Sequence, residues 1–179
     1  MGIDPGTNFM GYAIIKVFGK NQKPELVVSG IVDMIKITDP YIKLQRIFSR
    51  TLQVIDSYQP DELALEAQFY GKNVQSMLKL GRAQGVAIAA ALQRDIPIFE
   101  YAPKKIKMSI TGTGEASKEQ IALLLGKFMT IPTTISTLDE TDAIAIAYCH
   151  HLQGNLPTTG NPKCKDWGDF IKQNPDKVL

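Results

Sequence analysis

Two acidic residues stand where short apolar strands are predicted to end. Asp4 follows Gly2–Ile3 and precedes a Pro-Gly turn, and Glu66 closes the apolar segment Leu63–Leu65. Burying a carboxylate is costly unless a cation or hydrogen-bond donors compensate its charge, which favours a role as metal ligand. Asp-Pro-Gly is also a common turn sequence, in which the Asp side chain bonds to its own backbone. Asp4 alone fits both interpretations equally, so the choice depends on whether further acids lie nearby.

Two more acids occupy the first turn of a predicted helix that begins near residue 136. Asp139 and Asp142 are three residues apart and therefore share one face, which continues into Ala143 and Ile146. The helix dipole favours a single acid at this position in any case. Two acids on an inward face would be buried against apolar groups unless a cation lies between them.

Together the four acids predict a site for Mg²⁺ or Mn²⁺. Carboxylates are the hard ligands that these ions prefer, and Mg²⁺ takes part of its shell from water and from a phosphate substrate. Two such ions about 4 Å apart can activate a water molecule and stabilise the leaving oxygen of a displacement at phosphorus. The predicted reaction class is therefore phosphodiester hydrolysis.

The order of the predicted elements brings Glu66 near Asp4. Residues 11–17 and 26–37 are rich in Val and Ile and predict two strands that form an antiparallel meander with the first strand. A helix is predicted from Asp39-Pro40 to Gln59, and a helix between two strands makes those strands parallel. The strand at 62–66 is therefore expected beside the first one.

The remaining elements complete an α/β fold. A strand is predicted at 96–101, between a long helix that starts at Val74 and a helix that starts with a Ser117–Gln120 capping box. The expected architecture is a mixed five-stranded sheet, with three antiparallel strands followed by parallel ones and with helices on both faces.

Composition narrows the class of protein further. The chain has 179 residues, 44% of them hydrophobic and 21% charged, which suits one folded domain and excludes a mainly disordered chain. Its longest apolar run, Val86–Leu92, is far shorter than the roughly 20 residues that cross a bilayer. Two cysteines are too few for a disulfide framework, so we expect free thiols in a reducing cytoplasm.

Two further segments allow more than one interpretation. Phe69 and Lys72 lie in a Gly/Asn loop directly after Glu66, where an aromatic ring could stack on a nucleobase or could pack into the core. Gly81, Gly85 and Ala89 recur every four residues along the next helix. Such a stripe of small residues predicts close helix packing, either against the sheet or against a second copy of the chain.

With these residues the sequence resembles the RuvC family of crossover junction endodeoxyribonucleases, whose fold is RNase H-like. The resemblance runs from residue 1 to about residue 151. Six separate blocks carry it: Gly2–Thr7 with Gly11–Tyr12, Leu65–Glu66, Phe69–Asn73, Lys79–Ala87, Phe99–Pro103 and Asp142–Ala147.

The resemblance implies a specific activity. It implies a cytoplasmic homodimer, with an RNase H-like nuclease domain at 1–152 and a C-terminal tail at 153–179, that works beside a branch-migration motor. The implied reaction is symmetric nicking of two strands of a four-way Holliday junction in recombination and repair, which leaves 5′-phosphate ends. The implied cofactor is Mg²⁺, two ions per subunit, with Mn²⁺ as a substitute.

The resemblance also assigns roles to residues. The acids Asp4, Glu66, Asp139 and Asp142 would hold the metals and carry the chemistry, although the third position varies between Asp and His in the family and leaves Glu140 as an alternative to Asp139. The expected DNA contacts are Phe69, Lys72, Lys107 and Lys118. The expected dimer contacts are Gly81, Arg82, Gly85 and Ala89.

Two other functions fit parts of the sequence. Asp4-Pro5-Gly6-Thr7 also resembles the first phosphate loop of the actin and Hsp70 ATPases, but those proteins need a second Asp-Gly phosphate loop, which this chain does not show. A non-catalytic junction-binding module would keep the fold without the activity. Four intact acids argue against that second alternative.

Overall fold

The computed structural model describes residues 1–19, 22–68, 73–131 and 137–154. The predicted DNA contacts Phe69 and Lys72 lie outside the described residues, and so does the predicted tail from residue 155 onward.

A five-stranded mixed sheet forms the centre of the fold, as predicted. Its strands lie in the order β3-β2-β1-β4-β5. Strand β2 is antiparallel to both β3 and β1, whereas β4 pairs in parallel with β1 and β5 pairs in parallel with β4. The strands are β1 (Gly2–Asp4), β2 (Phe9–Lys16), β3 (Glu25–Asp33), β4 (Leu63–Glu66) and β5 (Ile98–Tyr101).

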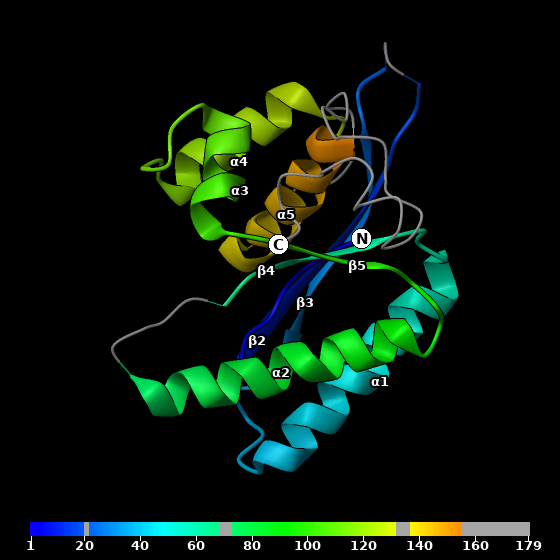
Figure 1. The fold of residues 1–179 in the computed structure, drawn as a ribbon, viewed down its shortest axis with the longest axis vertical. Coiled ribbons are helices and arrows are strands. Elements are labelled where there is room, and N and C mark those ends of the chain that lie inside the picture. The colour runs from blue at the N-terminus through cyan, green and yellow to red at the C-terminus, as the bar shows by residue number, and fades with distance from the viewer. Residues whose placement is uncertain (20–21, 69–72, 132–136, 155–179) are drawn as a thin grey trace, which may run out of the picture.

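Helices cover both faces of this sheet (Figure 1). On one face α1 and α2 lie side by side, and on the other α3, α4 and α5 gather together. The helices are α1 (Pro40–Tyr58), α2 (Val74–Leu92), α3 (Pro103–Thr111), α4 (Lys118–Phe128) and α5 (Leu138–Gly154). Among the described residues, no helix is long and apolar enough to span a membrane.

Successive side chains along the central strands point to opposite faces of the sheet, and this divides the core into two layers. Ile3 and Leu65 are fully buried beneath α1 and α2, whereas their neighbours Gly2 and Ala64 face α5. The residues toward α5 are small, and this difference lets the backbone of α5 come much closer to the sheet than that of α1 or α2.

Glycines on the central strands permit this close approach. A Cβ atom added at Gly2 would meet the carbonyl oxygen of Ala143, and one added at Gly11 would meet the carbonyl oxygen of Asp139. The first turn of α5 therefore lies directly against β1 and β2, which brings its acids to the end of β1.

One expectation about the elements was wrong. The strand expected to reach residue 37 ends at Asp33, because the Asp33 carboxylate accepts a hydrogen bond from the Ile35 N–H at 2.9 Å and a turn begins there. The lysine-rich segment after β5, for which the sequence pattern predicts no element, forms helix α3. Pro103 occupies its first turn, and Ile106 and Ile110, four residues apart, bury one face.

Candidate active site

Three of the four predicted acids converge at one end of the sheet. Asp4, the last residue of β1, lies opposite Gly11 in the register of β2, directly under the first turn of α5. Asp139 and Asp142 come from that turn. One carboxylate oxygen from each of the three residues lies within 4.8 Å of the other two. The structure therefore brings together the strand acid and the helix pair, as their positions in the sequence predict.

The fourth acid, Glu66, lies beside this cluster. Ile3 pairs with Leu65 in the parallel register, so the next residues along, Asp4 and Glu66, end neighbouring strands. A cavity of about 260 Å³ separates Glu66 from the helices on that face of the sheet. Its lining residues are Asp4, Glu66, Pro103, Ile106, Lys107, Lys118, Ile121, Asp142 and Ala145.

Burial and mutual charge repulsion change the protonation of the cluster. Burial, together with the negative charges of Asp142 and Glu66, raises the pKa of Asp4 to about 7, although Lys118 opposes the shift. Burial also raises the pKa of Glu66, with Asp142 adding to the effect. The protein alone thus does not compensate all the negative charge that these side chains would carry when ionised.

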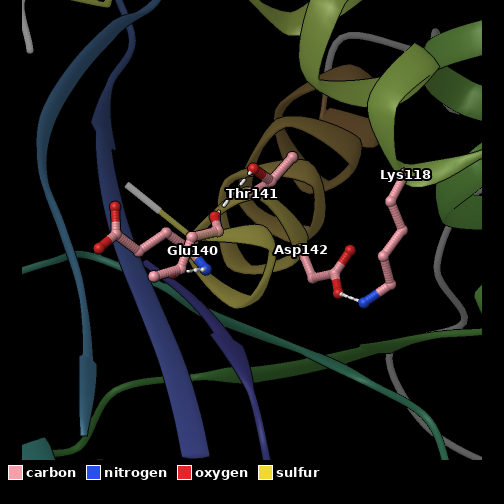
Figure 2. Close-up of polar contacts among 5 residues, drawn as sticks. Lys118, Glu140, Thr141 and Asp142 are labelled. Atoms are coloured by element: carbon pink, nitrogen blue, oxygen red, sulfur yellow. Dashed lines mark hydrogen bonds and ion pairs between the residues drawn. The ribbon is translucent and has the colours of Figure 1, made fainter. Parts of the chain in front are cut away.

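Two lysines predicted to contact DNA line the same cavity. Lys107 comes from α3, and Lys118, the first residue of α4, forms an ion pair with Asp142 (Figure 2). Burial lowers the pKa of Lys118, but its hydrogen bond and charge interaction with Asp142 outweigh that effect and raise it. The ammonium group of Lys118 is therefore held at the acidic cluster and not on an outer face. No local pattern indicates this pairing, because the partners are 24 positions apart in the sequence.

Glu140, the alternative to Asp139, lies on the other side of α5. Figure 2 shows its side chain directed toward the strands, whereas Asp142 faces Lys118. Only 8% of Glu140 is exposed, and its carboxylate lies 3.4 Å from the Ser29 hydroxyl of β3, which donates to it. The geometry favours Asp139 as the third acid.

Gln84 is a residue of the site that the sequence interpretation missed. Its side-chain amide donates to the backbone carbonyl of Glu66 at 3.3 Å and to the Glu100 carboxylate at 2.5 Å. Gln84 is buried on the inner face of α2, between Ala83 and Ala87. The available signal was an amide on an otherwise apolar face, since a buried amide requires partners. Gln84 therefore ties α2 to the strand end that carries Glu66.

The predicted stripe of small residues on α2 does not pack within one chain. Gly81, Gly85 and Ala89 are exposed, and a Cβ added at either glycine would meet nothing within 4 Å. The interpretation of this stripe as a seam against the sheet is wrong. The alternative, contact with a second copy of the chain, stays a prediction.

Comparison with known proteins gives a consistent result. The sequence profile of the family described as crossover junction endodeoxyribonuclease RuvC matches residues 1–150. The RuvC protein of Bacteroides fragilis is 54% identical over 180 residues, which cover 99% of this chain and 94% of that protein. The RuvC protein of Porphyromonas gingivalis is 52% identical, with 99% of this chain and 95% of that protein covered.

Solved structures agree with the sequence matches. The fold resembles that of Thermus thermophilus RuvC in complex with a Holliday junction substrate, with a TM-score of 0.79 and 28% identity over 87% of this chain and 93% of that one. A second structure of Thermus thermophilus RuvC gives a TM-score of 0.78, with 29% identity over 87% of this chain and 94% of that one. The family profile matches most of the chain, and the two bacterial relatives are more than half identical to it. This chain therefore belongs to the crossover junction endodeoxyribonuclease RuvC family.

Proposed function

We propose that this protein is an endonuclease that resolves four-way DNA junctions by nicking two opposed strands symmetrically during recombination and repair. The observation that carries the proposal is the convergence of acids from β1, β4 and α5 with two lysines around one cavity. Family membership excludes the ATPase interpretation of Asp4–Thr7. Intact and converging acids favour an active enzyme over a non-catalytic junction-binding module.

The cluster fits divalent metal ions. Its donors are carboxylate oxygens at one end of the sheet, and the pKa of Asp4 is raised because this carboxylate is buried beside the negative charges of Asp142 and Glu66. We propose that Asp4, Glu66, Asp139 and Asp142 hold two Mg²⁺ per subunit, or Mn²⁺ in their place. When bound, such ions lower the pKa of an attacking water and stabilise the departing 3′ oxygen, which would leave 5′-phosphate ends.

Lys107 and Lys118 place positive charge at the cavity where the DNA strand would bind. A DNA strand brings its own negative charge, so an ammonium group beside the acids reduces the repulsion between strand and site. Lys118 is already ordered there by Asp142, and Lys107 lines the same cavity. We propose that both lysines contact the phosphate that is cut and hold it over the acids.

A homodimer would present two such sites to a junction with matching two-fold symmetry. We propose that α2 forms the interface, through Gly81, Arg82, Gly85 and Ala89. The exposed apolar residues Val74, Leu78 and Leu92, of which 67%, 59% and 55% is accessible, extend the same helix face. The two ends of α2 thus offer apolar contact area, and its glycines permit close approach of a second helix.

The remaining elements of the proposal follow from the family. We propose that the nuclease domain spans residues 1–152 and the tail 153–179, that the protein acts in the cytoplasm, and that it works beside a branch-migration motor. The family profile ends at residue 150, close to the proposed boundary.

A cleavage assay tests the function. The wild-type protein is incubated with a labelled four-way junction, a linear duplex of the same sequence and an RNA–DNA hybrid, with Mg²⁺ or with a chelator. We expect cleavage of the junction only, in Mg²⁺ only, and none by Asp4→Asn. Asp61→Asn, which removes an exposed acid at the opposite end of β4 from Glu66, should cut like wild type. Equal cleavage of the duplex or hybrid would contradict the proposal.

A further inference from the structure

A second cavity, of about 500 Å³, lies between the N-terminal halves of α1 and α2. Three cationic side chains line it, and none of the described residues that line it carries a carboxylate. The lining residues are Thr7, Asn8, Thr38, Pro40, Tyr41, Lys43, Leu44, Ile47, Ser76, Lys79, Leu80, Arg82 and Ala83. We call this cavity the basic cleft. Its charge is complementary to that of an anionic ligand.

Lys43 is held in a fixed position at the floor of the cleft. Its ammonium group donates to the carbonyl oxygen of Thr7 at 3.0 Å and to the side-chain oxygen of Asn8 at 2.7 Å. An ammonium group has three donors, so these two contacts leave one for a ligand. The loop that Lys43 holds is the one that follows Asp4.

The other two cations come from one face of α2. Lys79 and Arg82 are three residues apart, so their side chains are neighbours on the helix surface. Among the described residues, neither side chain has a hydrogen bond or an ion pair. The ammonium group of Lys79 can bind a phosphate as a point charge, and the guanidinium group of Arg82, one of the proposed dimer contacts, adds positive charge beside it.

The basic cleft is close to the acidic cluster along the chain. Thr7 at its edge is three residues after Asp4, a stretch that spans at most about 11 Å even when fully extended. A DNA strand that runs from the acids across this edge of the sheet would reach the cleft within a few nucleotides. The hydroxyl groups of Thr7, Thr38 and Ser76 add further donors for phosphate oxygens.

We infer that the basic cleft binds the sugar–phosphate backbone of the junction, next to the strand that is cut. The inference rests on the proposed function and adds a DNA contact away from the metal site. Lys79 contacts a phosphate there, and Lys43 both binds phosphate and fixes the loop after Asp4. Backbone contacts of this kind position DNA without reading its sequence.

The test compares Lys79→Ala with Lys16→Ala, each added to Asp4→Asn so that the DNA stays intact. Lys16 is an exposed lysine at the opposite end of β2 from the site. Affinity for two labelled junctions of different sequence is measured by fluorescence anisotropy over a range of salt concentrations. We expect Lys79→Ala to bind both junctions severalfold more weakly, by the same factor, with a log–log salt slope shallower by about 1.

Three results would overturn the inference. The first is affinity and salt slope equal to those of Lys16→Ala. The second is a loss that differs between the two junction sequences, which would indicate base contacts. The third is a loss that follows dissociation of the dimer in sedimentation, which would place Lys79 in the subunit interface. If the Asp4→Asn parent bound no junction at all, the proposed function itself would fail, and the cleft would fail with it.

Discussion

At the scale of single residues, Asp4 is the most strongly perturbed acid of the site. Its pKa rises from an ordinary 3.8 to about 7 because burial and the charges of Asp142 and Glu66 disfavour ionisation. In the absence of metal the folded protein therefore holds a proton that the unfolded chain releases. Because the folded state binds more protons between these two pH values, its stability falls as the pH rises from about 4 to about 7.

Asp4→Asn should therefore stabilise the metal-free protein at neutral pH. We expect a melting temperature a few degrees above that of wild type at about pH 7.5 in chelator, with the gap closing toward pH 4, where Asp4 is protonated in both states. Added Mg²⁺ should raise the melting temperature of wild type more than that of the variant. Thermal denaturation followed by circular dichroism measures both effects, with Asp61→Asn as control. A gap that widens at low pH would contradict this account.

Asp139 and its neighbour Glu140 should behave differently. Asp139 lies with Asp4 and Asp142, whereas Glu140 contacts Ser29 on the far side of α5. We expect Asp139→Asn to reduce junction cleavage at least tenfold, a loss typical of a disturbed metal site. Glu140→Gln, which keeps an acceptor for Ser29, should cut within about twofold of wild type. The reverse order of activities would assign the third ligand to Glu140.

At the scale of elements, the site depends on how closely α5 approaches the sheet. Gly2 and Gly11 face the backbone of α5. Because neither residue has a side chain, the first turn of α5 and its Asp139 can lie close to the end of β1. Glycine here provides space and not a special backbone conformation, because neither residue has a positive φ.

Gly11→Ala should push α5 away from β2. We expect a loss of about 1–3 kcal/mol in the free energy of unfolding, as overpacking typically causes, together with weaker cleavage because Asp139 and Asp142 move with the helix. Urea denaturation and cleavage at saturating junction concentration measure the two effects. Gly19→Ala serves as control, since a Cβ there meets nothing within 4 Å. Unchanged stability would show that α5 tolerates the extra atom.

The elements also show how far the sequence was informative. The sheet order and the meeting of Asp4 with Glu66 followed from local signals, namely strand patterns and the helix between them. Helix α3 was missed because its lysines obscured a short apolar repeat. The Lys118–Asp142 pair and the Gln84 contacts join distant segments, and no local pattern encodes such contacts.

At the scale of the whole molecule, the exposed face of α2 is the expected contact between subunits. Gly85→Glu should leave the monomer folded, because its new side chain enters open space, but should dissociate a dimer that packs on this glycine. Gly126→Glu is the control, because Gly126 is an exposed glycine in the last turn of α4 with equally open surroundings. Analytical ultracentrifugation should find a weakened dimer for Gly85→Glu alone. A stable Gly85→Glu dimer would place the interface elsewhere.

The most direct test of the account maps the nicks on a four-way junction. Each of its four strands is end-labelled in turn, the junction is cut by the wild-type protein in Mg²⁺, and the products are offered to DNA ligase. The account predicts nicks in two opposed strands at symmetric positions, with 5′-phosphate ends that ligase seals, and no nicks from Asp4→Asn. Nicks in all four strands, ends that ligase does not seal, or cleavage by Asp4→Asn would contradict it.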